Sequence, residues 1–268
     1  MKKFILAILL IAISFSLSAC VSGESIDNKT LVIGASPVPH AEILEFIRPL
    51  LLEKGYTLEI VQFTDYVLPN SSLDNKELDA NFFQHVPYLE YFNQENGTSI
   101  VSAGKVHFEP LGIYAGTSNS LSNITNGAVI AIPNDSTNLA RALLLLQANN
   151  LITLDPEAGL GATVLDITSN PYDIEIVEIE AAGIPARLLD VDFAVINGNY
   201  ALSSNVVEKL LVSESPDSEA ALLYANIIAV RSGDENKEAI LILLEVLQSE
   251  EVRQFILDNY NGLVLPVF

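Results

Sequence analysis

The stretch Ile132-Pro-Asn-Asp-Ser-Thr-Asn-Leu-Ala-Arg-Ala-Leu-Leu-Leu-Leu-Gln147 joins a strand to a helix through a capped turn. It continues the apolar run Ala128–Ile132, which has the composition of a buried strand, and Pro133 ends that run. The polar side chains at 135–137 can each cap a helix by accepting backbone N–H bonds. An apolar helix is therefore predicted over residues 139–147.

Arg141 is the one charged residue in this apolar helix. A guanidinium group is costly to bury without an anionic partner. Asn138 lies three residues earlier on the same helix face, in the first turn, where free N–H groups and the helix dipole favour anions. The pattern predicts a receptor for a carboxylate or a phosphate. The alternative is that Arg141 pairs with one of the many Asp and Glu side chains of the chain.

The amino terminus has the features of an export signal. It starts with Met1-Lys-Lys3, continues with an apolar segment too short to span a membrane well, and reaches Leu17-Ser-Ala-Cys20. This ending resembles a bacterial lipobox, which is cut before the cysteine that then carries lipid. We expect a signal peptide over 1–19 and a lipidated Cys20 that opens a flexible tether over 20–29. The alternative is a plain secretory signal with an accidental cysteine.

Charge and cysteine content exclude several classes of protein. The formal charge of −21 becomes −23 when Lys2 and Lys3 leave with the signal peptide. Such an acidic chain should not bind nucleic acid and gains nothing from an anionic membrane surface. Cys20 is the single cysteine, which excludes an internal disulfide and a cysteine-based zinc site. An anionic ligand would need a local positive site, such as Arg141.

Strands and helices are expected to alternate along the chain, which indicates an α/β fold. The expected strands are 31–36, 56–63, 80–85, 100–115, 128–132, 173–180, 192–197 and 222–230. The expected helices are 41–53, a polar one ending near 78, one starting at 87, 139–147, a short one at 184–190 and a long one at 237–257.

The strand expected over 80–85 should place its side chains alternately on two faces. Asn81, Phe83 and His85 would share one face, and Phe82 and Gln84 would share the other. Core packing is the favoured interpretation for Phe82.

Aromatic side chains gather where two of the expected strands end. Tyr66, Phe83, His85 and Tyr88 lie at strand carboxyl ends or just beyond, and this edge of an open parallel sheet is where ligands bind. The alternative for the aromatic rings is ordinary core packing. For His85 the alternative is a core histidine whose hydrogen bonds are made within the protein. The other two histidines are expected outside the site. His40 would be solvated at a helix entry, and His107 would face a polar surface.

No catalytic or cofactor motif is present. The chain has no glycine-rich phosphate loop, His-Glu-x-x-His, Gly-x-Ser-x-Gly or calcium loop, and three scattered histidines do not predict a metal site. We expect no enzyme activity, no cofactor and no metal. A cleft with one cation, amide side chains and aromatic rings suits a small amphipathic zwitterion with an apolar tail.

Four blocks of sequence resemble a known family. They are Phe63–Asn70, Asp79–His85 with Pro87-Tyr-Leu89, Pro133–Leu139 with Arg141, and Ala194–Asn197 with Tyr200. These blocks, in this order, are similar to those of the methionine-binding lipoproteins of bacterial ABC importers, the NlpA lipoprotein family. The resemblance extends from Leu31 to the carboxyl terminus.

The resemblance implies a two-lobed periplasmic-binding-protein (type II) fold with the ligand cleft between the lobes. One lobe would comprise 30–113 and 223–268, and the other 114–222. The protein would capture L-methionine and deliver it to a membrane permease with its ATPase subunits. Capture of D-methionine stays an open question. It would be a monomer, held on the cell membrane by lipid such as palmitate on Cys20 and facing outside the cytoplasm.

The resemblance also implies roles for individual residues. Arg141, beside Asn138, would clamp the ligand carboxylate, and Asn197 and Asn226 would fix the carboxylate and amino ends. The thioether side chain would be surrounded by Tyr66, Phe83, His85 and Tyr88. Two alternatives stay open. One is a binding protein for a methionine-containing dipeptide or another apolar amino acid. The other is a lipid-anchored hydrolase centred on His85, for which we find neither a nucleophile nor a metal site.

Overall fold

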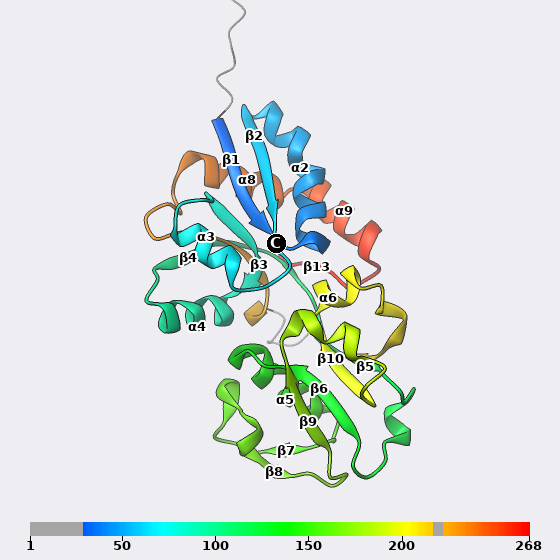
Figure 1. The fold of residues 1–268 in the computed structure, drawn as a ribbon. Coiled ribbons are helices and arrows are strands. Elements are labelled where there is room, and N and C mark those ends of the chain that lie inside the picture. The colour runs from blue at the N-terminus through cyan, green and yellow to red at the C-terminus, as the bar shows by residue number, and fades with distance from the viewer. Residues whose placement is uncertain (1–28, 217–221) are drawn as a thin grey trace, which may run out of the picture.

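The computed structural model describes residues 29–216 and 222–268, which form two lobes, each built on its own β-sheet with helices on both faces (Figure 1). The chain leaves the first sheet after Phe108 and returns to it at Asn226. This confirms the expected α/β fold with two lobes. The division at 113/114 and 222/223 stays a prediction; the second sheet begins at Gly112.

The first lobe contains a six-stranded sheet in the order β13-β4-β12-β3-β1-β2. β1 runs parallel to β2 and β3, whereas β12 is antiparallel to both β3 and β4, and β13 is antiparallel to β4. The strands are β1 (Lys29–Ala35), β2 (Tyr56–Gln62), β3 (Ala80–His85), β4 (Ile100–Phe108), β12 (Asn226–Arg231) and β13 (Leu265–Pro266).

Helices cover both faces of this sheet because their apolar side chains recur at helical spacing. On one face, α2 (Glu42–Glu53) buries Ile43, Leu44 and Ile47 in a core shared with α8 (Glu238–Leu247) and α9 (Glu250–Tyr260). The other face carries α3 (Leu68–Asp74) and α4 (Val86–Asn96). A short helical turn, Pro37–Ala41, leads into α2.

The second lobe contains a five-stranded sheet in the order β11-β5-β10-β6-β9. β6 is parallel to β9 and β10, and β5 is antiparallel to β10 and β11. The strands are β5 (Gly112–Ala115), β6 (Val129–Pro133), β9 (Glu175–Ile179), β10 (Phe193–Ile196) and β11 (Leu210–Ser213).

Helix α5 (Ser136–Ala148) packs its apolar side chains against β6 and β10, and α6 (Gly198–Ser203) lies on the opposite face of the sheet. β7 (Thr153–Leu154) and β8 (Ile167–Ser169) form a separate antiparallel pair. Short 3-10 turns occupy Leu121–Asn123, Gly159–Gly161, Val164–Asp166, Ala181–Gly183, Pro185–Arg187 and Val207–Lys209.

Several expected elements differ from the observed ones. The expected strand 100–115 is two strands in different sheets, separated by residues 109–111, because Pro110 lacks the N–H that a continuous ladder needs. The expected helix 237–257 is broken at residues 248–249, where the Ser249 hydroxyl caps the new helix α9 by accepting from Val252 N–H.

Three smaller differences concern element ends. The polar helix ends at Asp74 rather than near 78, the strand expected from 222 begins at Asn226, and the helix expected over 184–190 is a single 3-10 turn. In the described parts of the chain, no helix is long and apolar enough to cross a membrane.

Candidate functional site

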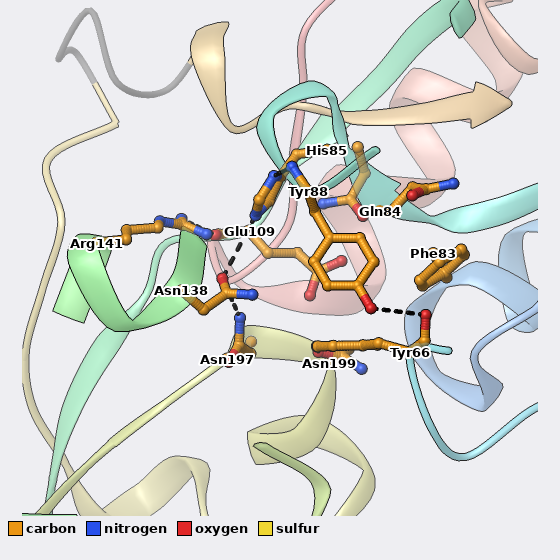
Figure 2. Close-up of a pocket in the computed structure, with 12 residues that line it drawn as sticks. Tyr66, Phe83, Gln84, His85, Tyr88, Glu109, Asn138, Arg141, Asn197 and Asn199 are labelled. Carbon is orange, nitrogen blue, oxygen red and sulfur yellow. Dashed lines mark hydrogen bonds between the residues drawn. The ribbon is translucent and has the colours of Figure 1, made fainter. Parts of the chain in front are cut away.

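A pocket lies between the lobes, at the carboxyl ends of β3 and β10 and the start of α5 (Figure 2). Both lobes and the crossover at 109–111 contribute side chains to it. All eight residues that the sequence predicted for the site line this pocket. The full lining is Tyr66, Phe83, Gln84, His85, Tyr88, Glu109, Asn138, Arg141, Asn197, Gly198, Asn199 and Asn226.

A chain of hydrogen bonds through His85 and Asn138 fixes one wall of the pocket. His85 Nδ1 accepts from Tyr88 N–H at 3.2 Å, so its Nε2 carries the proton and donates to Asn138 Oδ1 at 3.4 Å. Asn138 Oδ1 also accepts from Asn197 Nδ2 at 2.9 Å. Because His85 belongs to the first lobe and the two asparagines to the second, the His85–Asn138 bond joins the lobes, and the Asn197–Asn138 bond holds the acceptor in place (Figure 2).

The cap of α5 orients Asn138. Asp135 accepts the Asn138 backbone N–H at 3.0 Å and the side-chain amide at 3.0 and 3.1 Å. The sequence offered residues 135–137 as caps, and Asp135 is the one that acts. The capping carboxylate therefore fixes both the helix start and the amide that points into the pocket.

Arg141 lines the pocket and is also part of an internal ion pair. Its Nε and Nη2 donate to the carboxylate of Glu214 at 2.7 and 2.5 Å, and Nη2 also donates to the Glu109 carbonyl at 2.9 Å. The guanidinium carbon lies 4.4 Å from the centre of the Tyr224 ring. The alternative stated for Arg141, pairing with an internal carboxylate, is what the structure contains.

The predictions for His40 and His107 were wrong, because both side chains are fully buried. They converge on Glu109, whose Oε1 lies 2.7 Å from His107 Nε2 and 3.3 Å from His40 Nε2. His40 Nε2 also lies 2.9 Å from Asn226 Oδ1. Alternation failed in β4 because its pairing with β12 shifts register twice. By ligand type the three groups could hold a metal ion, but their spacing is that of hydrogen bonds.

Burial sets the charge of these groups. It lowers the pKa of His40 to about 4 and the pKa values of His85 and His107 to about 3, with the positive charge of Arg141 adding to the effect on His85. All three rings are therefore neutral near pH 7. Burial raises the pKa of Glu109, while electrostatic coupling to His40, the positive charge of Arg141 and a backbone N–H bond from Asn199 oppose that rise.

The opposite end of the pocket is aromatic. The Tyr66 ring centre lies 5.8 Å from those of Phe83 and Tyr88 and 4.9 Å from that of Tyr200. Tyr66 donates its hydroxyl to Asn199 Oδ1 at 2.6 Å, which again joins the lobes. Figure 2 shows Phe83 and Tyr66 on the far side of the pocket from Arg141.

The register of β3 agrees with the sequence for its two phenylalanines. Phe82 packs in the core of the first lobe, and Phe83 lines the pocket. The alternation fails at Gln84. Its Nε2 donates to Asn81 Oδ1 at 2.9 Å, so the side chains of Gln84 and Asn81 lie on the same face of the strand. A register shift between β3 and β12 at this point is the reason.

Four of the lining residues were not predicted from the sequence: Gln84, Glu109, Gly198 and Asn199. A Cβ atom at Gly198 would lie 2.9 Å from Glu109 Cβ and 3.0 Å from its Oε2, so only glycine admits the carboxylate here. The Asn197-Gly-Asn199 sequence after a strand was the signal that could have located this turn. Cys20 lies outside the described residues.

Comparison with known proteins gives a consistent result. The profile of the NlpA lipoprotein family matches residues 31–268. The methionine-binding lipoprotein MetQ of Bacillus subtilis (strain 168) is 41% identical over 274 residues, covering 100% of this chain and 99% of that protein.

Solved structures are similar along nearly the whole described chain. A nutrient binding protein from Burkholderia cenocepacia bound to methionine has a TM-score of 0.84 at 40% identity, covering 89% of this chain and 100% of the other. A periplasmic substrate-binding protein of an ABC transporter from Coxiella burnetii has a TM-score of 0.83 at 36% identity, covering 88% of this chain and 100% of the other.

Proposed function

The chain belongs to the NlpA lipoprotein family, and we propose on this premise that it is the substrate-binding lipoprotein of an ABC importer that captures methionine. The observation that carries the proposal is the pocket between the lobes. Charged and amide groups lie at one end of it and aromatic rings at the other. An amino acid with a long apolar side chain has the same distribution of polar and apolar groups.

The ligand ammonium group would lie beside Glu109. This carboxyl group lines the pocket and lies within hydrogen-bond distance of His107 and His40, and it accepts the Asn199 N–H, so its oxygens are held in place as acceptors. Asn197 Oδ1 is buried without a hydrogen-bond partner among the described residues. A buried acceptor without a donor is costly, and a ligand N–H would satisfy it.

The ligand carboxylate would be held by Arg141 and by amide N–H groups. Asn226 Oδ1 is engaged with His40, which leaves its amide nitrogen as a donor toward the pocket. The guanidinium charge lies close enough to the pocket to contribute to the low pKa of His85. Charge-assisted hydrogen bonds of this kind are stronger than neutral ones.

The thioether would contact Tyr66, Phe83, His85 and Tyr88. Sulfur packs favourably against aromatic rings, and a flexible unbranched side chain fits between them. The hydroxyls of Tyr66 and Tyr88 are engaged by Asn199 Oδ1 and the Tyr66 carbonyl, so the rings turn apolar surface to the ligand.

We further propose that the protein binds its ligand without converting it. Both ring nitrogens of His85 are occupied by hydrogen bonds, and its low pKa makes it a poor proton acceptor near pH 7.

The captured ligand would pass to a permease with ATPase subunits. Lipid on Cys20 would hold the protein, as a monomer, on the outer side of the membrane. The proposed lobes are 30–113 with 223–268, and 114–222.

Native mass spectrometry of the purified protein tests the proposed ligand. We expect an adduct with the mass of methionine, or its appearance when L-methionine is added. An adduct of dipeptide mass, or of a different amino acid, would replace methionine as the ligand. Methionine that binds and is released chemically altered would contradict the non-catalytic role.

A further inference from the structure

Most hydrogen-bond donors of Arg141 are used by the protein itself. A guanidinium group has five N–H donors. Nε and one N–H of Nη2 bind the carboxylate of Glu214, and Nη2 also reaches the Glu109 carbonyl. The two N–H groups of Nη1 have no hydrogen-bond partner in residues 29–216 and 222–268. These are the donors that remain for a ligand.

Glu214 is itself held firmly. Its backbone N–H donates to the Leu111 carbonyl at 3.0 Å, and its Oε2 accepts from the Leu111 N–H at 2.9 Å. It directly follows β11, and Arg141 is on α5, so both belong to the second lobe. A change in the angle between the lobes would leave this ion pair intact.

Glu214 does not line the pocket between the lobes. It lines a separate hollow that also touches Arg141, together with Leu144 and Leu223. The Glu214 carboxylate therefore approaches the guanidinium from outside the pocket and does not occupy the position of a ligand carboxylate. This arrangement argues against an internal competitor that a ligand would have to displace.

We infer that Glu214 is a positioning residue that fixes Arg141 so that its Nη1 edge alone meets the ligand carboxylate. The inference rests on the proposed function. The ion pair places the guanidinium before the ligand arrives, which lowers the entropic cost of binding. It also neutralises a buried cation in the empty pocket. The ligand contact would then be through one nitrogen rather than through the usual two-point contact of arginine with a carboxylate.

The pairing of Arg141 with Glu214 also affects which ligands the pocket accepts. Arg141 and Glu214 together are neutral, so Glu109 gives this part of the pocket a net negative charge when it is ionised. Such a site accepts a zwitterion and disfavours an anion. A ligand that keeps its carboxylate but has lost its ammonium charge, such as N-acetylmethionine, should therefore bind poorly.

Calorimetric titration of L-methionine and methionine amide into the full-length protein and its variants tests the role of Glu214. Glu214→Ala should weaken methionine binding by about tenfold or more and should change amide binding little. Glu214→Gln retains one acceptor and should lose less. In the Arg141→Ala background, Glu214→Gln should have no further effect on methionine affinity, because the two residues act together.

A matched control is Glu208→Gln, which removes the same charge from an exposed position just before β11. It should leave both affinities unchanged. Equal losses for the acid and the amide in Glu214→Gln would reduce Glu214 to a structural residue, and tighter methionine binding would make it a competitor; either result overturns the inference alone. Failure of the parent protein to bind methionine would overturn the proposed function and this inference with it.

Discussion

Arg141 lies in an ion pair and in the pocket wall at once, so its replacement should have two measurable effects. Arg141→Ala leaves Glu214, whose side chain is only 11% exposed, without its partner, which should lower the melting temperature. It should also weaken methionine binding by a factor of about thirty or more, since losing one partner of a buried charge pair costs roughly 2–5 kcal/mol. Arg141→Lys should recover only part of this, because an ammonium group lacks the planar set of donors.

Methionine amide separates the two effects. It lacks the carboxylate charge, so it should bind the parent protein poorly and lose little more in Arg141→Ala. Titrations of both ligands into both folded proteins, with melting curves recorded in parallel, give the comparison. Equal losses for acid and amide would mean that Arg141 supports the fold and does not hold the carboxylate.

Some residues of the pocket could be predicted from the sequence, and others could not. Arg141 and Asn138 were accessible because helical spacing alone puts them on one face near a capped turn. Glu109 could not be predicted, because it lies in a crossover that has no periodic pattern. It contacts His107 at the end of β4 and His40, which is far away in the sequence, and its burial depends on these contacts. The burial of His107 in turn depends on register shifts between β4 and β12 that the sequence does not mark.

At the level of elements, β3 divides its two phenylalanines between different tasks. In the core, the centre of the Phe82 ring lies 4.7 Å from that of His40 and 5.2 Å from that of His107. At the pocket, the centre of the Phe83 ring lies 6.0 Å from that of Tyr88. Phe83→Ala should weaken methionine binding by roughly 1–3 kcal/mol. Phe82→Ala should lower the free energy of unfolding by about 3–5 kcal/mol with affinity nearly unchanged.

Calorimetry and urea denaturation on the two variants check this division, each variant serving as the control for the other. The reverse assignment would place the strand register off by one residue. The observed bulge beside Gln84 shows how narrowly that register is fixed, because one residue further along β3 the simple alternation already fails.

Element boundaries were predictable where a residue ends the hydrogen-bonding pattern on its own. Gly55 follows α2 with a positive φ, and a glycine in that conformation just after a helix is a common way for the helix to end. The break between α8 and α9 was missed because the apolar spacing continues through it, and only the Ser249 cap divides the helix. A capping residue inside a long periodic run can therefore mark the start of a new helix that the apolar spacing alone does not indicate.

At the scale of the whole molecule, acid should destabilise the fold through its histidines. The chain has three, and burial lowers the folded-state pKa of each below the usual 6.5, to about 4 for His40 and about 3 for His85 and His107. The unfolded chain then binds more protons below pH 6.5, so the free energy of unfolding should fall from there down to about pH 4. Each histidine contributes up to about 1.4 kcal/mol per pH unit.

Glu109 and Asp135 act in the opposite sense at the acidic end, because burial raises their pKa values and the folded state takes up their protons first. Urea denaturation at several pH values between 7.5 and 5 measures the slope, and His107→Gln should reduce it. A free energy of unfolding that does not change over this range would contradict the buried, neutral state of the three rings.

Membrane attachment is a second property of the whole chain. The Leu17-Ser-Ala-Cys20 sequence predicts that Cys20→Ala leaves the protein unprocessed or released, with methionine affinity intact. Labelling with palmitate, followed by membrane fractionation, checks this, with the parent protein as control. A Cys20→Ala protein that is still acylated and membrane-bound would exclude the lipobox.

We propose that the two lobes close on one methionine molecule. Titration of L-methionine into the purified protein, followed by calorimetry and by the melting temperature, measures this binding. We expect saturation at one ligand per chain and a melting temperature that rises with ligand concentration, as a ligand specific for the folded state requires. No heat of binding and an unchanged melting temperature at millimolar methionine, in protein shown to be free of bound ligand, would contradict it.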